Sequence, residues 1–219
     1  MTYFGQKVVL TTKHNKEQVI APLFAEVLGM EVVVHEADTD QLGTFSGIIP
    51  RLGTMEETVV AKAKIGLEAA GCEFGIASEG AFGPHPISGF LPVDTEMIAF
   101  IDRKNDFKII ETILSTNTNY NPNLKNDMRA HMNPMRMRVI HQVCQKLVQR
   151  LARMCPACDL PGFGCVDLVR GLPCETCGLK TDLVKAEVHG CVKCDFRQEQ
   201  AKLLQYTVAP MQYCNFCNP

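Results

Sequence analysis

The sequence predicts an α/β fold with a mixed sheet, followed by a bridging helix and a small zinc-ribbon module. Short apolar runs alternate with segments of helical spacing through the first half of the chain, and a long amphipathic segment follows. Eight of the eleven cysteines then fall in four Cys-x-x-Cys pairs. We expect an α/β domain over residues 1–132, a basic bridging helix over residues 133–154 and a zinc module over residues 155–219.

A strand, a loop and a helix open the chain. Residues 7–12 are β-branched and apolar, which predicts a strand, and residues 17–28 have helical spacing. Asn15 is suited to cap this helix. The free amides of the helix start, with Lys13 and Lys16 beside them, can hold a phosphate group. The alternative is that Lys16 is a solvated lysine of the first turn.

An acidic loop and a second helix come next. After a strand over residues 31–35, three carboxylates fall within five residues, and Asp38 and Asp40 among them predict either a metal site or an acidic turn. Thr54 and Glu57 then match a capping box at a helix start. Glu57 is therefore either part of a helix cap or a functional carboxylate.

Residues 76–83, IASEGAFG, predict a buried strand that ends in a carboxylate and glycines. Because a buried charge is costly unless a cation or a hydrogen-bond donor meets it, Glu79 needs a partner. Ligands of α/β folds bind at such strand ends. Glu79 is thus our candidate for a metal-binding or general-base carboxylate, and a paired or solvated glutamate is the alternative.

A β-hairpin and a long helix complete this half of the chain. The apolar runs at residues 97–101 and 107–113 flank a four-residue turn, and Asn133 followed by Pro134 predicts a capped helix start. Residues 121–153 hold seven Lys/Arg against one Asp/Glu. Such a segment can meet a phosphate-bearing ligand directly, whereas the acidic N-terminal body needs divalent cations to do so.

The segment in front of the long helix could bind an anion. Arg129, His131 and Arg136 could converge on a phosphate, which arginine binds through two parallel hydrogen bonds. The alternative is an ion pair between Asp127 and Arg129 in front of the helix cap.

The cysteine spacing predicts two structural zinc sites. The four pairs are separated by 15, 13 and 19 residues, and each Cys-x-x-Cys turn presents two thiolates, so two pairs complete a site of four cysteine ligands. We favour nested pairing, with the two inner pairs sharing one ion and the two outer pairs the other; sequential pairing is the alternative. We expect Cys72, Cys144 and Cys165 to be buried free thiols. The predicted zinc ligands are Cys155, Cys158, Cys174, Cys177, Cys191, Cys194, Cys214 and Cys217.

Residues 7 to about 120 resemble the house-cleaning nucleoside triphosphate pyrophosphatases, the inosine/xanthosine triphosphatase superfamily. The correspondence rests on TTKHNK after the first strand, TMEETVVAKAKIG at the second helix and GIASEG on the central strand. The resemblance implies a long mixed sheet, a first loop that holds the triphosphate through Asn15 and Lys16, and metal-binding or water-activating roles for Glu57 and Glu79 around Mg²⁺.

Two parts of the chain depart from that superfamily. The loop GIIPR at residues 47–51 lacks the metal-binding glutamate found upstream of the second helix in those enzymes, for which Asp38 or Asp40 would have to substitute. Residues 127–219 have no counterpart there. The stretch DMRAHMNPMR and the four cysteine pairs resemble instead an uncharacterised family of bacterial proteins, which implies no activity.

These features favour a Mg²⁺-dependent hydrolase that acts on a nucleoside triphosphate or a related nucleotide. Metal-bound oxygens would neutralise the phosphates, and Glu79 or Glu57 would orient the attacking water. Developing charge would be stabilised by Lys16, Arg129 and Arg136. The candidate magnesium ligands are Glu79, Asp38 and Asp40. We assign substrate binding to Thr12, Lys13, Asn15, Lys16, Arg129, His131 and Arg136.

Two other functions are compatible with the sequence. The protein could be a catalytically silent nucleotide sensor whose zinc module docks a partner protein or a second copy of the chain. It could instead associate with nucleic acid, although the near-neutral charge of residues 154–219 argues against this. The sequence has no export signal and no apolar run of membrane-spanning length, which predicts a cytoplasmic protein without membrane contact.

Overall fold

The computed structural model describes residues 2–37, 42, 53–121, 129–201 and 206–219. The chain divides into two compact units, Met1–Ala152 and Arg153–Pro219. The long helix predicted as a bridge belongs to the first unit. Asp38, Asp40 and Asp127 lie outside the described residues, so the predictions made for them stay predictions.

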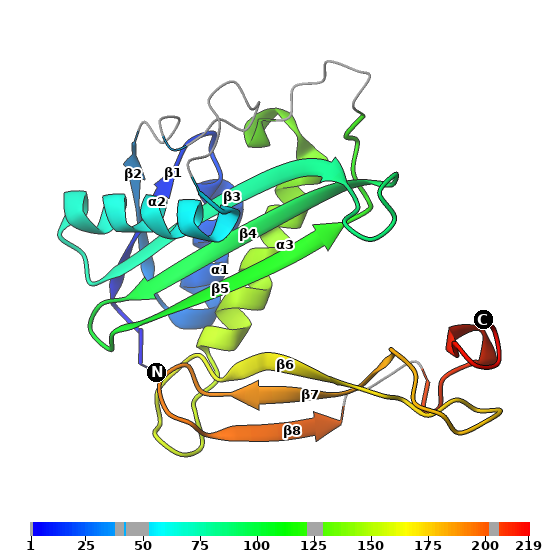
Figure 1. The fold of residues 1–219 in the computed structure, drawn as a ribbon. Coiled ribbons are helices and arrows are strands. Elements are labelled where there is room, and N and C mark those ends of the chain that lie inside the picture. Colours follow the sequence, from blue (N-terminus) through cyan, green and yellow to red (C-terminus); the bar gives the residue numbers. More distant parts are fainter. Residues whose placement is uncertain (1, 38–41, 43–52, 122–128, 202–205) are drawn as a thin grey trace. The chain divides into compact units, whose positions relative to one another are not determined.

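A five-stranded mixed sheet with the order β2-β1-β3-β4-β5 forms the centre of the first unit (Figure 1). β1 pairs in parallel with β2 and β3, whereas β3, β4 and β5 form an antiparallel meander. The predicted α/β class with a mixed sheet is confirmed. The strands are β1 (Lys7–Thr12), β2 (Glu31–Glu36), β3 (Phe74–Pro84), β4 (Pro92–Asp102) and β5 (Phe107–Ser115).

Helices cover both faces of this sheet (Figure 1). α2 (Met55–Ala70) packs on one face, while α1 (Glu17–Leu28) and α3 (Pro134–Leu151) lie against each other on the opposite face. A short 3-10 helix, η2 (Ala130–Met132), precedes α3. None of the described helices combines the length and the hydropathy needed to cross a membrane.

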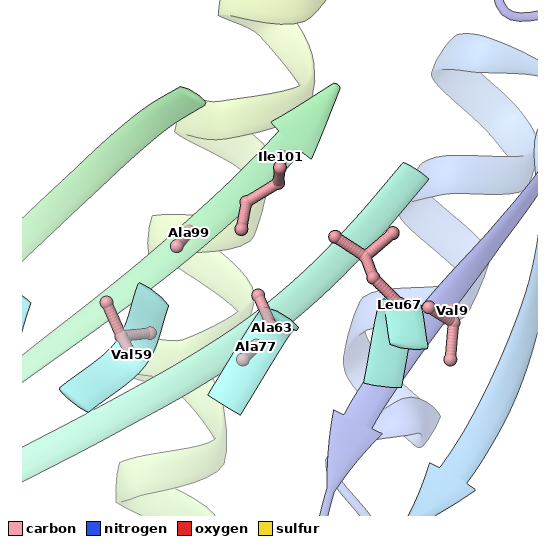
Figure 2. Packing of buried hydrophobic residues seen from close by; sticks show 7 residues of the cluster. All are labelled: Val9, Val59, Ala63, Leu67, Ala77, Ala99 and Ile101. Carbon is pink, nitrogen blue, oxygen red and sulfur yellow. The ribbon is translucent and has the colours of Figure 1, made fainter. Parts of the chain in front are cut away.

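Figure 2 shows the core under α2. Val59, Ala63 and Leu67 of α2 pack against residues of the strands, and Ala63 lies over Ala77. Small residues such as Ala77 and Ala99 let the helix approach the sheet closely. Successive side chains of a strand point to opposite faces. Ala99 of β4 therefore faces α2, whereas Phe100 faces α1, where it stacks on Phe24 with ring centres 6.2 Å apart. Glu96 and Asp94 share the face of Phe100.

Local signals set the ends of the helices. Thr54 and Glu57 form the predicted capping box at the start of α2, and Asn133 Oδ1 accepts a hydrogen bond from the Arg136 amide at 3.1 Å at the start of α3. The prediction that Asn15 caps α1 is wrong. Lys16 is the N-cap residue, and its side chain makes no capping hydrogen bond.

The second unit contains a three-stranded antiparallel sheet of β6 (Gly164–Arg170), β7 (Val184–Gly190) and β8 (Arg197–Ala201), in that order. The short 3-10 helix η3 (Met211–Tyr213) lies just before the last cysteine pair. The hydrophobic cluster of the second unit has three buried members, Cys155, Phe163 and Cys191. A unit with so little apolar core depends on an additional source of stability, such as a bound metal.

Candidate functional site

Eight cysteines of the second unit form two clusters of four, and within each cluster all sulfur atoms lie within 4.8 Å of one another. Four thiolates held at about 2.3 Å around a tetrahedral zinc ion lie about 3.8 Å apart. The clusters match this spacing and could each bind one zinc ion. Four sulfur ligands leave no open coordination position, so such an ion is structural. The measured sulfur separations are 3.7 Å for Cys155–Cys194, 3.6 Å for Cys158–Cys191, 3.9 Å for Cys174–Cys217 and 3.6 Å for Cys177–Cys214.

The pairing of the cysteine turns is interleaved, so the favoured nested pairing and the sequential alternative are both wrong. The first pair shares a cluster with the third, and the second pair with the fourth. The hairpin explains this arrangement. Gly164 at the start of β6 pairs with Gly190 at the end of β7, which brings together the cysteine turns before β6 and after β7. The second pair lies beyond the far end of the hairpin, a strand length of about 23 Å away.

Backbone amides favour the thiolate of one cysteine, Cys174, in the cluster of Cys174, Cys177, Cys214 and Cys217. The amides of Cys177 and Thr176 lower the pKa of Cys174 to about 7, and the amide of Thr176 lies 3.4 Å from Cys174 Sγ. Cys174 therefore forms the thiolate more readily than a free cysteine does, and the thiolate is the form that binds metal.

The three remaining cysteines differ from one another. Cys144 is buried, and its burial raises the pKa of its thiol to about 12. Cys72 and Cys165 are only partly buried. The expectation of a buried thiol therefore holds for Cys144 alone.

In the first unit, the loop between β1 and α1 has an unusual backbone. His14 and Asn15 have φ values of 72° and 58°, in the left-handed region that non-glycine residues seldom occupy. Each such residue costs on the order of 1 kcal/mol, and conformations of this kind cluster at ligand-binding loops. The loop is thus a candidate site on its geometry as well as on its sequence.

Lys16, which ends this loop, is buried against β3. The residue is 8% exposed, and its Nζ donates to Ser78 Oγ at 3.0 Å and to the Ser78 carbonyl at 3.4 Å. Burial lowers the pKa of Lys16 to about 8, and Arg136 lowers it further, while Glu96 and Glu79 oppose the shift. The alternative of a solvated lysine is wrong.

Glu79 has a cationic partner. It is 3% exposed and accepts a hydrogen bond from Lys62 Nζ of α2 at 2.5 Å. The prediction that this carboxylate needs a partner is met by an internal ion pair on the α2 face of the sheet, which corresponds to the paired alternative.

The two described candidates for magnesium ligands, Glu57 and Glu79, each contact a partner within the protein. Glu57 is exposed, and its carboxylate accepts from the Thr54 amide at 2.7 Å, which lowers the pKa of Glu57. Glu79 is engaged with Lys62. Among the described residues, the two four-cysteine clusters are the only groups of three or more potential ligands close enough to share an ion.

A second buried ion pair lies at the start of α3. Arg136 Nε donates to Glu96 Oε1, and the two residues are 3% and 0% exposed. Gly80 on β3 makes room for this pair, because a Cβ there would overlap both Arg136 Nη2 and Glu96 Oε1. Arg136 therefore points into the protein, whereas Arg129 and His131 are exposed.

Two carboxylate oxygens beside this pair lack a donor. Within the described part of the chain, Asp94 Oδ1 and Glu96 Oε2 are buried and accept no hydrogen bond. Burial raises the pKa of Asp94 to about 7, and the charge of Glu96 adds to the shift, while Arg136 and Lys16 oppose it. Asp94 can thus gain or lose a proton near neutral pH.

The two segments predicted to bind phosphate meet in the structure. The imidazole rings of His14, from the β1–α1 loop, and His131, from η2, stack with centres 5.1 Å apart. Lys13 and Arg129 are exposed in the same two segments, and Thr12 is buried with its hydroxyl donating to the Lys13 carbonyl at 3.2 Å.

The start of α3 also contacts the segment that follows β5, at Asn119. Asn133 Nδ2 donates to Asn119 Oδ1 at 3.0 Å. Next to it, Tyr120 stacks on Phe82 with ring centres 5.4 Å apart, and the Arg136 guanidinium lies 5.7 Å from the centre of the Phe82 ring. The first turn of α3 therefore joins the β3–β4 hairpin, the exit from β5 and, through η2, the β1–α1 loop.

The sequence did not single out three of these buried charged residues, which lie on both faces of the sheet: Asp94, Glu96 and Lys62. Asp94 and Glu96 alternate with Thr95 and Met97 in the β4 sequence, a pattern that also fits a solvated strand face. Lys62 lies about one turn after the buried Val59 and next to the buried Ala63 of α2. Its position on the core side of the helix could have predicted a buried cation.

A family model described as Domain of unknown function (DUF6671) matches residues 62–123 and 122–219. This confirms the resemblance to an uncharacterised family. No curated protein matches the chain. The resemblance to the triphosphatase superfamily finds no support in these comparisons.

Solved structures of competence-damage proteins are similar to part of the chain at 18% identity. At their TM-scores the likeness carries no argument about function. They are competence damage-inducible protein A (ComA) from Klebsiella pneumoniae (TM-score 0.37, covering 68% of this chain and 88% of that one), a competence or damage-inducible protein from Enterobacter asburiae (0.34, 66% and 87%) and a competence-damaged protein (CinA) superfamily protein from Enterobacter cloacae (0.34, 66% and 82%).

Proposed function

The chain belongs to the family described as Domain of unknown function (DUF6671), and we propose that this member binds a phosphorylated nucleotide beside the β1–α1 loop and hydrolyses one of its phosphate bonds. The two four-cysteine clusters, in this proposal, hold structural zinc ions that stabilise the second unit.

The single observation that carries the proposal is the stack of His14 on His131. It brings a helix start with two lysines next to a second basic segment. Cationic side chains and imidazole donors together favour a phosphate group. The left-handed backbone at His14 and Asn15 is the kind of strain that ligand-binding loops retain.

The buried charges behind the loop supply the chemistry in this proposal. In this proposal Lys16 supplies positive charge where negative charge develops during phosphoryl transfer, whereas Arg136 stays paired with Glu96. Asp94, with a pKa raised to about 7, can take a proton from the attacking water. The new bond joins the water oxygen to phosphorus as the bond to the leaving phosphate oxygen breaks.

Turnover tests the proposal. The purified protein should release phosphate or pyrophosphate from at least one member of a panel of standard and deaminated nucleoside triphosphates, assayed with Mg²⁺ and with EDTA. Lys16→Met should lower the rate at least about tenfold, because it removes the buried cation. Lys104→Met, at an exposed lysine of the β4–β5 turn, should leave the rate unchanged. Absence of release from every nucleotide would overturn hydrolysis.

The ion pair of Glu79 with Lys62 favours a second candidate, binding without turnover. A carboxylate held by a lysine is not available to activate water or to bind a metal ion. In that case nucleotides raise the melting temperature of the protein, no phosphate is released, and Glu79→Gln changes neither result beyond its effect on stability.

A further inference from the structure

We infer that the groove between α1 and α3 holds the nucleoside part of the ligand, so that the protein recognises a nucleotide and not a phosphate chain alone. This inference rests on the proposed function. It assigns a second subsite to the residues that line the groove. Of these, only His131 also belongs to the proposed phosphate site.

The groove has the size and the chemical mixture of a small-molecule site. Its volume is about 570 Å³, within the range of roughly 300–1,000 Å³ typical of ligand pockets. Val19 and Met137 supply apolar wall, and Gln18 and Gln142 supply amide groups that can both donate and accept hydrogen bonds. This combination suits a flat heterocycle whose edge carries donors and acceptors.

The polar side chains of the groove favour a ligand that carries hydrogen-bond acceptors and no positive charge. Arg138, His131 and His141 line it, and no carboxylate is found among its described lining residues. α3 itself contains no Asp or Glu. An arginine in such a position donates to the carbonyl and ring-nitrogen acceptors of a base, and a glutamine can pair with an amide-like edge. A cationic ligand is disfavoured by the same charges.

The groove adjoins the loop proposed to hold phosphate through His131. His131 lines the groove and also stacks on His14 of that loop. Gln18 lies two residues after Lys16, on the first turn of α1. One ligand can therefore place its phosphates at the loop and its base along α1 and α3.

Comparison of a nucleotide with its bare phosphate chain tests the inference. ATP, GTP and sodium tripolyphosphate are titrated into the full chain by calorimetry. We expect at least one of the two nucleotides to bind at least about tenfold more tightly than tripolyphosphate, because only the nucleotide gains contacts in the groove. Tripolyphosphate that binds as tightly as both nucleotides would overturn the subsite while leaving the phosphate site intact. Binding of none of the three would overturn both.

Groove variants locate the effect. Arg138→Gln combined with Gln142→Ala should weaken binding of the preferred nucleotide about tenfold and change binding of tripolyphosphate by less than about twofold. Gln145→Ala is the matched control, because Gln145 is exposed on the same helix but does not line the groove. All these positions are on the surface, and thermal unfolding verifies that each variant is folded. Equal weakening of both ligands, or of neither, would contradict the inference.

Discussion

The two units hold their polar groups in different ways. In the second unit each cluster contains four cysteines from two short turns, close enough to share one ion. In the first unit the charges come from distant elements and largely satisfy one another, as Lys62 does for Glu79 and Arg136 for Glu96. Each cysteine cluster could therefore take up an ion that the chain does not supply, whereas the buried ion pairs of the first unit form between its own side chains.

Removal of zinc should have the largest effect, and only on the second unit. Structural zinc contributes on the order of 10 kcal/mol to the folding of small modules, while the first unit has its own core. Chelation should make residues 153–219 sensitive to protease and leave the first unit resistant. Limited proteolysis followed by mass spectrometry measures this, and loss of both units together would show that the two are not independent.

Paired cysteine variants test the interleaved arrangement. Elemental analysis should find two zinc ions per chain in the wild type. Cys155→Ser with Cys191→Ser should remove one ion, because both belong to one cluster, and Cys155→Ser with Cys174→Ser should remove both. Sequential pairing predicts the opposite pair of results, and Cys165→Ser serves as the control that retains both ions.

Breaking the buried pair in the first unit should have the next largest effect. Arg136→Met leaves Glu96 buried without its cation, which costs about 3–5 kcal/mol. Gly80→Ala places a methyl group against both partners and should cost about 1–3 kcal/mol. Gly83→Ala on the same strand meets nothing within 4 Å and should change stability by less than about 0.5 kcal/mol. Urea unfolding gives all three values, and equal effects of the two glycine variants would contradict the packing described.

The difference between the units also explains what the sequence could predict. Cys-x-x-Cys turns carry their chemistry within four residues, so two zinc clusters were predictable. Their interleaved pairing was not, because it depends on the register of the β6–β7 hairpin. In the first unit the need of Glu79 for a partner was predictable from its apolar strand. That Lys62 meets it follows from the packing of α2 on the sheet, which short-range patterns do not specify.

The same argument applies to the residues around Arg136. The sequence predicted that Arg136 lies at the start of a basic helix, and it predicted that this side chain binds phosphate. Its inward direction depends on Glu96 being on the same face of β4 as Phe100, and on Gly80 leaving space above β3. These are properties of the sheet, and they turn a predicted phosphate ligand into half of a buried ion pair.

Titration of Asp94 should produce a smaller effect. Its folded pKa of about 7 lies above the usual value near 4, so between those pH values the folded state holds a proton that the unfolded state has lost. Stability should therefore fall as pH rises from 4 to 7, by at most about 1.4 kcal/mol per pH unit. Urea unfolding of Asp94→Asn across this range should show a flatter profile. An unchanged slope would contradict the raised pKa.

Changes at the α2 cap should have the smallest effect. Thr54→Ala removes the side-chain acceptor of the capping box and should cost about 1 kcal/mol. Glu57→Gln should leave turnover and nucleotide affinity unchanged, because Glu57 is engaged at the cap. Loss of turnover in a Glu57→Gln protein of normal stability would restore its predicted catalytic role.

Amide chemical shifts during a nucleotide titration test the central claim most directly, since they locate a ligand without requiring turnover. With the full chain and a nucleoside triphosphate, the largest shift changes should fall at residues 13–18 and at residues 129–131, the two segments joined by the stacked histidines. Changes confined to residues 153–219, or no changes in the two segments at saturating nucleotide, would contradict the account.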